Sequence, residues 1–234
     1  MARVSHSLLD PFVSPLVAPL YRALPIPMRF PPEGIVLIGH LIAIGGAVGF
    51  AFSTHFWWAG ILAMAGVAGN HVADMVDGTH ARRTGQCRNG GELLDHFTDP
   101  LSFAYWMVGL SVSCGRLDLG IALVICIYAT SVLTIIKAKI IGEFTLARFG
   151  PTEFKALLCL YGVAMAIVRC LDAQGKSSGV MATWFAGGLV ALGVGQLIVN
   201  LVLAVRTVNR SSAPPDTSEW KMTQTEELQG ESSV

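Results

Sequence analysis

Six long apolar stretches alternate with short polar segments along the chain, and each is close to the ~20 residues that a helix needs to cross a bilayer. We expect the membrane-spanning helices to cover residues 35–53, 56–77, 92–113, 118–141, 153–171 and 179–206. The pattern therefore predicts an all-α integral membrane protein with six transmembrane helices.

The two ends of the chain have a different pattern. Five prolines between Pro11 and Pro27 interrupt the apolar run that a signal peptide would need. Leu8, Phe12 and Leu16 fall at helical spacing, which is typical of a short helix lying at the headgroups. Residues 211–234 are polar and acidic, as in disordered segments. We divide the chain into an N-terminal interfacial segment (1–34), a six-helix domain (35–206) and a disordered polar tail (207–234).

The overall composition supports the membrane assignment. Hydrophobic residues make up 53% of the chain, charged residues 14%, and the mean hydropathy is +0.57, whereas soluble domains are about 25% charged. The net charge of zero gives no indication of a nucleic-acid partner. The five cysteines are scattered without a CxxC pair, so we interpret them as small buried hydrophobes and expect neither disulfides nor a zinc site.

The distribution of lysine and arginine predicts the orientation in the membrane. With both termini in the cytoplasm, that side carries thirteen of the sixteen cations: Arg3, Arg22, Arg29, Arg82, Arg83, Arg88, Lys137, Lys139, Arg148, Lys155, Arg206, Arg210 and Lys221. Arg116, Arg169 and Lys176 remain on the other side. The asymmetry predicts six crossings with both ends inside and the polar site described next near the cytoplasmic face.

Acidic residues are concentrated in one part of these apolar stretches. Asp74, Asp77, Glu92, Asp95 and Asp99 lie within twenty-six residues. Carboxylates at membrane depth need cations, water or a substrate to stabilise them. Asp74 and Asp77 share one helix face, and Asp95 and Asp99 share another, so two adjacent helices could bring four carboxylates together. Hard oxygen ligands favour Mg²⁺, Mn²⁺ or Ca²⁺, and the lack of organised Cys or His disfavours zinc.

The segment between these acids combines glycines with arginines. Glycine permits close approach of the backbone to a ligand, and guanidinium groups match phosphate oxygens in bidentate fashion. The residues concerned are Gly78, Gly85, Gly90, Gly91, Arg82, Arg83 and Arg88. Together with two metal ions, they predict a site for a diphosphate, where catalysis is largely charge stabilisation and alignment.

The same residues resemble the signature of the CDP-alcohol phosphotransferases, which is DxxDGxxAR, eight residues, then GxxxDxxxD. All eight fixed positions are in register: Asp74, Asp77, Gly78, Ala81, Arg82, Gly91, Asp95 and Asp99. The resemblance implies a reaction in which an acceptor hydroxyl attacks a phosphorus of a CDP-linked donor and displaces CMP. The resemblance also implies that one of the two substrates is a lipid.

The resemblance also implies a role for each residue of the signature. The four aspartates, Asp74, Asp77, Asp95 and Asp99, would hold two divalent ions, Mg²⁺ or Mn²⁺. The CDP moiety would contact the remaining four positions, namely Gly78, Ala81, Arg82 and Gly91.

The sequence around the signature is similar to the choline and ethanolamine phosphotransferase branch of the family. Enzymes of this branch transfer the phospho-alcohol group from CDP-choline or CDP-ethanolamine to diacylglycerol. The strings Ala-Arg-Arg-Thr and Gly-Glu-Leu-Leu-Asp-His carry this similarity. Glu92 and His96 would match the pair that accepts the hydroxyl proton, with Asp99 as the substitute base. Because Glu92 and His96 are four residues apart on one predicted helix, the carboxylate can orient the imidazole. Pro100 departs from the Ser usual in this branch.

Several alternatives stay open from the sequence. The other branch of the family uses CDP-diacylglycerol with a polar alcohol such as inositol, glycerol phosphate or serine. A cation transporter also carries acids within its spans, but acids gathered at one level and interleaved with Gly, Ala and Arg favour an enzyme. We interpret His40, His55, His71 and His80 as structural or solvated. Glycines in the first and last spans allow close packing or a homodimer face.

Overall fold

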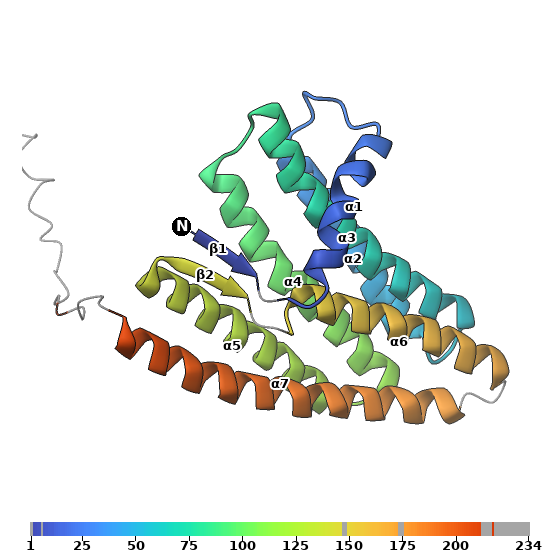
Figure 1. Ribbon diagram of the computed structural model, residues 1–234. Coiled ribbons are helices and arrows are strands. Elements are labelled where there is room, and N and C mark those ends of the chain that lie inside the picture. The colour runs from blue at the N-terminus through green and yellow to red at the C-terminus, as the bar shows by residue number, and fades with distance from the viewer. Residues whose placement is uncertain (1, 6, 147–148, 173–175, 212–216, 218–234) are drawn as a thin grey trace, which may run out of the picture.

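A computed structural model describes residues 2–5, 7–146, 149–172, 176–211 and 217 (Figure 1). Within these residues there are seven helices and two short strands. In chain order they are β1 (Ala2–Ser5), α1 (Asp10–Ala23), α2 (Pro32–Phe52), α3 (Trp57–Thr84), α4 (Asn89–Cys114), α5 (Leu117–Ile141), β2 (Glu143–Leu146), α6 (Pro151–Leu171) and α7 (Lys176–Arg210). Each of the six apolar stretches thus forms a helix, as predicted.

Five of these helices, α2, α3, α5, α6 and α7, are long and apolar enough to cross a membrane. Helix α4 is long enough but does not reach the same hydropathy, because Glu92, Asp95 and Asp99 lie in its first half. The predicted all-helical membrane architecture is therefore confirmed. Six crossings with both ends in the cytoplasm stay a prediction.

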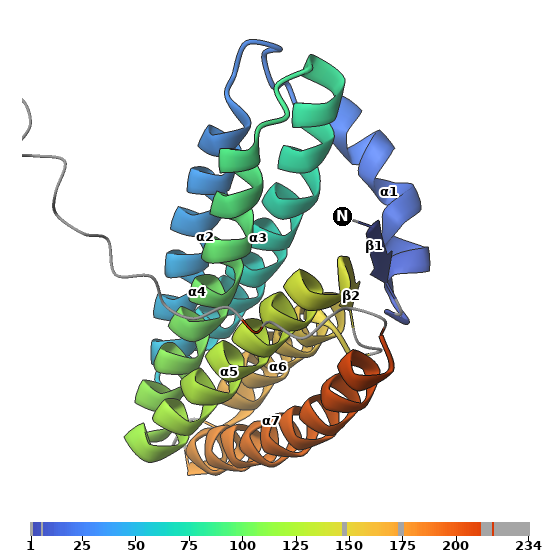
Figure 2. The same ribbon diagram turned by 90° about the vertical axis from the view of Figure 1, so that its left-hand side faces the viewer.

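Glycine allows the helices around α3 to approach very closely. Helix α3 packs against α2 on one side and α6 on the other, while α4 packs against α2 and α5 (Figures 1 and 2). A Cβ atom added to Gly66 would lie 2.2 Å from Cα of Gly46, and one added to Gly60 would lie 2.4 Å from the carbonyl oxygen of Gly162. Such backbone contact between small residues is the usual basis of helix association in membranes.

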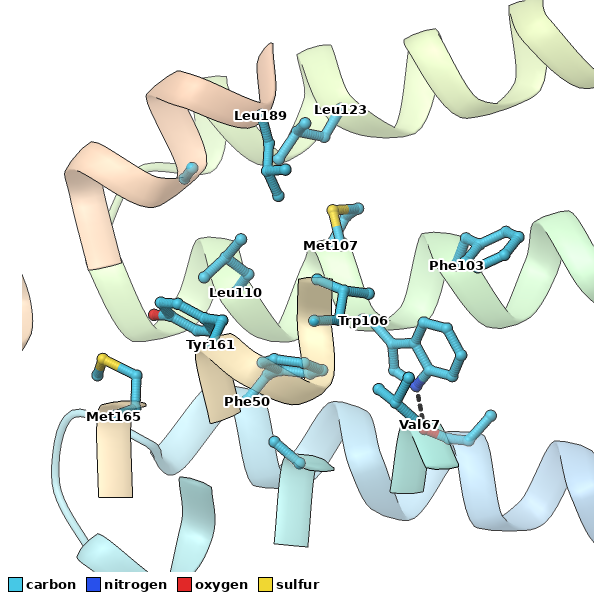
Figure 3. Close-up of a cluster of buried hydrophobic side chains, with 14 residues drawn as sticks. Phe50, Val67, Phe103, Trp106, Met107, Leu110, Leu123, Tyr161, Met165 and Leu189 are labelled. Carbon is cyan, nitrogen blue, oxygen red and sulfur yellow. Dashed lines mark hydrogen bonds between the residues drawn. The ribbon is translucent and has the colours of Figure 1, made fainter. Parts of the chain in front are cut away.

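The apolar core lies among these helices and is built around aromatic residues of four of them, α2, α4, α6 and α7 (Figure 3). Trp106 is fully buried, and its indole Nε1 donates a hydrogen bond to the carbonyl oxygen of Ala43 at 2.9 Å. Tyr161 stacks on Phe185 with ring centroids 3.9 Å apart. These contacts fix α4 against α2 and α6 against α7.

The N-terminal segment is tied to the start of α6. Strand β1 pairs in parallel with β2, a short sheet that the apolar pattern did not predict. The buried carboxylate of Glu153 accepts hydrogen bonds from Ser7 Oγ (2.6 Å), from the backbone N–H groups of Leu8 (2.7 Å) and Leu9 (3.0 Å), and through its other oxygen from the N–H of Gly150 (2.8 Å). One carboxylate therefore joins segments about 145 residues apart in the chain.

The short N-terminal helix expected from the sequence is present as α1. Leu8, just before the helix, and Phe12 and Leu16 within it are all more than 60% exposed and lie four residues apart. Leu20 and Tyr21 instead pack against a small cluster that includes Ile35. The outward apolar stripe suits a helix in the headgroup region, and its interfacial position stays a prediction.

Helix α7 extends four residues beyond the boundary that we expected between the six-helix domain and the tail. Helix α7 continues to Arg210, so residues 207–210, which we assigned to the disordered tail, are helical. The apolar and small residues of the last span run into Val205 and Val208 without a proline or glycine to end the helix. Apart from 211 and 217, the rest of the tail lies outside the described residues.

We expect the substitution Gly66→Ala to destabilise the fold. Its Cβ would overlap the Gly46 backbone, and overpacking of this kind costs about 1–3 kcal/mol. The measurement is the thermal unfolding midpoint of the detergent-purified protein. Gly187→Ala is the matched control, because a Cβ there meets nothing within 4 Å. Equal midpoints for the two variants would contradict the close approach of α2 and α3.

We expect Glu153→Ala to release the N-terminal segment, because the donors that it satisfies are buried or half-buried and lose their acceptor. Limited proteolysis should then cut between residues 2 and 10 faster than in the wild type. The control is Asp118→Ala, which removes a 61% exposed carboxylate that pairs with the nearby surface cation Arg116. If cleavage at the N-terminus is no faster in Glu153→Ala than in this control, the proposed tie is absent.

Candidate active site

Helices α3 and α4 run in opposite directions and both pack against α2, and this arrangement explains why the acidic residues meet (Figures 1 and 2). Gly85, with a φ of 70°, ends α3, and α4 begins four residues later at Asn89. Asp74 lies ten residues before the last residue of α3, and Asp99 ten residues after the first residue of α4. The two side chains therefore lie at the same level of the helix pair.

The four aspartates of the signature line one pocket between α2, α3 and α4. The full lining is Val36, Gly39, His40, Asn70, Ala73, Asp74, Asp77, Asp95, Thr98, Asp99 and Ser102. Asp74, Asp95 and Asp99 each offer a carboxylate oxygen within 4.8 Å of the others. Asp77 lines the same pocket but does not join this group, and its Oδ1 accepts a hydrogen bond from the N–H of Gly78.

The chemistry of this donor set fits a divalent cation. Three carboxylate oxygens from two helices converge on one point, and all three residues are partly buried. Oxygen donors of this kind are the ligands that Mg²⁺, Mn²⁺ and Ca²⁺ prefer. Within the described residues, this is the one cluster of acidic, histidine or cysteine side chains close enough to hold a metal ion.

A residue that the sequence did not single out completes the site. We counted Lys155 among the cytoplasmic charges that orient the chain, yet its side chain is only 2% exposed. Its Nζ lies 2.8 Å from Oδ2 of Asp74 and 3.8 Å from Oδ1 of Asp99. Three helices thus contribute charged groups to the site: α3 and α4 supply the carboxylates, and α6 supplies the cation.

The positions that the signature assigns to CDP lie nearer the end of the helix pair. Arg82 is exposed, and its guanidinium lies beside Gly78: a Cβ on that glycine would be 3.2 Å from Arg82 Nη1. Ala81 is partly buried on the same helix. Gly91 belongs to the first turn of α4, where a Cβ added to it would lie 3.9 Å from Glu33 Oε1. None of the four belongs to the lining of the aspartate pocket.

Glu92 and His96, the two residues predicted to accept the hydroxyl proton, lie close together on α4. His96 Nε2 lies 3.8 Å from Glu92 Oε1, and the two side chains are 33% and 52% exposed. His96 directly follows Asp95 in the chain, so it lies at the level of the carboxylate cluster. Both side chains are accessible to a substrate that enters from the end of the helix pair.

The other histidines differ from one another in their surroundings. His80 is fully buried and bridges Tyr21 Oη and the Phe30 carbonyl oxygen, both at 2.8 Å, so its structural assignment is confirmed. His40, which we expected to be structural or solvated, lines the aspartate pocket and contacts Ser102. The apolar pattern carried no signal for this placement, because it depends on how α2 packs on α4.

A second pocket lies on the other side of Asp74, between α1, α3 and α6. It is lined by Asp10, Val13, Ser14, Val17, His71, Asp74, Met75 and Thr152. Asp74 therefore faces both pockets, and the N-terminal helix forms a wall of the second one. His71 is also close to this shared carboxylate, with its Nδ1 3.9 Å from Asp74 Oδ2.

Comparisons with known proteins agree with this geometry. The family model described as CDP-alcohol phosphatidyltransferase matches residues 32–194, which is most of the predicted six-helix domain. Cholinephosphotransferase 1 of Mus musculus is 32% identical over 94 residues, covering 38% of this chain and 24% of the mouse protein. The enzymes of the same name from Bos taurus and Homo sapiens are 31% and 30% identical over 96 residues, covering 38% of this chain and 23% of each protein.

These relatives are matched over only about a quarter of their own length, whereas the family model spans well over half of this chain. The matched region contains every residue of the aspartate pocket and the whole signature. This integral membrane protein belongs to the CDP-alcohol phosphatidyltransferase family.

Proposed function

We propose that this protein transfers a phospho-alcohol group from a CDP-linked donor to a hydroxyl acceptor and releases CMP. The observation that carries the proposal is the convergence of Asp74, Asp95 and Asp99 in one pocket, within an intact family signature. A cluster of carboxylates within apolar helices needs a cationic partner, and a divalent ion that also binds the diphosphate of the donor would supply one. A transporter has no use for the adjoining glycines and arginine.

The proposed roles follow the positions of the side chains. The four aspartates of the signature would hold two divalent ions, Mg²⁺ or Mn²⁺. Asp74, Asp95 and Asp99 converge, and Asp77 lines the same pocket. When bound, such an ion withdraws electron density from the diphosphate and stabilises the charge that develops as the bond to CMP breaks.

The nucleotide would lie toward the exposed end of the helix pair. Gly78 and Gly91 leave room for the diphosphate near the backbone, and Ala81 keeps the same face of α3 small. The Arg82 guanidinium can bind the phosphate oxygens in bidentate fashion. CMP is then free to leave from this exposed end.

The hydroxyl proton of the acceptor needs a base in the same region. We propose that His96 accepts it and that Glu92, at 3.8 Å, orients the imidazole and balances its charge. As the acceptor oxygen bonds to phosphorus, the bond from phosphorus to the CMP oxygen breaks and the proton passes to His96. Asp99 is the alternative base.

The names of the matched relatives and the sequence around the signature support a choice of donor and acceptor. The three matched relatives carry the name cholinephosphotransferase 1. We therefore propose CDP-choline or CDP-ethanolamine as the donor and diacylglycerol as the acceptor. Because one substrate is a lipid, the reaction would take place at the membrane face, beside the aspartate pocket between α2, α3 and α4.

We expect purified protein to release CMP from CDP-choline or CDP-ethanolamine when diacylglycerol and Mg²⁺ or Mn²⁺ are present. Asp95→Asn should abolish this release, because it removes one of the three converging carboxylates. Chelation of divalent ions should have the same effect on the wild type. The measurement is CMP produced per minute from labelled donor.

Asp118→Asn is the control, because this exposed carboxylate pairs with Arg116 far from the signature. Parallel assays with CDP-diacylglycerol and a panel of polar alcohols decide between the family branches. Exclusive use of CDP-diacylglycerol would reject our choice of donor and keep the general reaction. Metal flux through vesicles without any CMP release would instead favour a transporter.

We expect His96→Ala to lower kcat by about 100-fold or more, the usual contribution of a general base, and to leave nucleotide affinity unchanged. Single-turnover CMP release and binding of CDP-choline measure the two quantities separately. His55→Ala serves as the control, since this histidine lies at the opposite end of α3. A normal kcat in His96→Ala would transfer the role of base to Asp99.

A further inference from the structure

A second layer of polar groups lies beneath the carboxylates of the aspartate pocket. Asn70 precedes Asp74 by four residues on α3, and Ser102 follows Asp99 by three residues on α4. Both positions are about one helical turn further from the short α3–α4 connection than the aspartates are. His40 of α2 lines the same pocket, and its Nδ1 lies 3.2 Å from Ser102 Oγ. We call these three residues, His40, Asn70 and Ser102, the polar floor of the pocket.

Asn70 is the member of the polar floor whose hydrogen bonding is incomplete. It is only 6% exposed, and its Nδ2 donates a hydrogen bond to the carbonyl oxygen of Gly39 at 3.3 Å. The reverse orientation of the amide would place two oxygens face to face, so this bond fixes the amide against α2. The other amide atom, Oδ1, is buried and has no hydrogen-bond partner among the described residues. Because a buried acceptor without a donor is costly, Asn70 Oδ1 needs a donor that enters the pocket.

The shape of the pocket limits what this donor can be. A Cβ added to Gly39 would lie 2.6 Å from the Cβ of Ala73, so α2 and α3 are in contact beside the polar floor. Trp106, four residues after Ser102, is fully buried and closes the far side. The pocket has an interior volume of about 10 Å³, which is close to the least that one water molecule occupies. The donor is therefore small and comes from the side of the carboxylates.

A water molecule bound to a divalent ion meets these requirements. Mg²⁺ in particular keeps several water ligands when carboxylates hold it, and each of these is a hydrogen-bond donor. The diphosphate of the CDP-linked substrate does not meet them, because its ionised oxygens are acceptors, as Asn70 Oδ1 is. Polar groups just outside the ligands of a metal ion commonly orient those ligands in this way.

We infer that Asn70 is a positioning residue of the divalent centre, whose Oδ1 accepts a hydrogen bond from a water ligand of an ion held by the signature aspartates. Ser102 and His40 border the same space on the α4 and α2 sides. The closed floor shields this water from displacement by the diphosphate, so Asn70 affects how tightly the ion binds. This inference rests on the metal centre of the proposed function.

The test measures binding of Mn²⁺ to the full chain purified in detergent. Titration followed by electron paramagnetic resonance gives the dissociation constant, and electron–nuclear double resonance in H₂O and D₂O detects the exchangeable protons of an ordered water ligand as a narrow signal. We expect the wild type to show this signal. We expect Asn70→Leu to lose it and to raise the Mn²⁺ dissociation constant by about 10–100-fold, the usual effect of removing a group that orients a metal ligand.

Two further variants separate the possible roles of the side chain. Asn70→Asp keeps an acceptor oxygen but lacks the N–H that bonds to Gly39. We expect it to bind Mn²⁺ at least as tightly as the wild type and to keep the narrow signal, whereas a side chain that only joined α3 to α2 would lose its role in both variants. Asn200→Leu makes the same change as Asn70→Leu on α7, outside the lining of the pocket, and should match the wild type. Circular dichroism and thermal unfolding establish that each variant is folded before Mn²⁺ is added.

The inference is overturned if Mn²⁺ bound to the wild type lacks the signal of an ordered water, a result that needs no variant to fold. It is also overturned if folded Asn70→Leu binds Mn²⁺ as tightly as the wild type, or if Asn70→Asp loses as much affinity as Asn70→Leu. These results leave the proposed function intact, because CMP release by the wild type is measured separately. Absence of Mn²⁺ binding together with absence of CMP release would reject the proposed metal centre itself, and this inference with it.

Discussion

The compensation of buried carboxylates is the constraint on which the arrangement of this protein depends. Four aspartates face one pocket inside a bundle whose outer surface is apolar, and uncompensated charge at membrane depth is costly. Cations that reach that pocket therefore favour association of the helices. Lys155 supplies one from α6, and the oxygen donors of Asp74, Asp95 and Asp99 are arranged for a dication.

Close helix packing is what brings these charges within range of one another. Lipid offers no hydrophobic driving force between helices, so backbone proximity at small residues decides which faces meet. Gly66 against Gly46 joins α3 to α2, and Gly60 against Gly162 joins α3 to α6. Helix α3 is thereby held on two sides, and Asp74 is placed both in the aspartate pocket and within reach of Lys155.

The parts of the structure that depend on local sequence were predictable. Apolar runs of sufficient length define the helices, and the i, i+3 and i, i+4 spacing of the acids defines the faces of α3 and α4 that line the aspartate pocket. The level of Asp74 opposite Asp99 follows from the short connection at Gly85. Helix ends were less predictable, as α7 shows, because the first prolines after the last span come only at positions 214 and 215, beyond the end of the helix at Arg210. The parts that depend on contacts between distant segments were not predictable from the pattern. Lys155 looks like any cytoplasmic lysine until α6 is packed on α3, and only then does its side chain face Asp74.

Glu153 and Lys155 show how the site is held together, because these two neighbouring charges on one helix turn have separate partners more than 80 residues away. Glu153 fixes the N-terminal segment and Lys155 fixes Asp74, so the first two turns of α6 connect the wall of the second pocket to the carboxylate cluster. Asp74 lies at the boundary of both pockets, so any change in the position of α6 alters the two together.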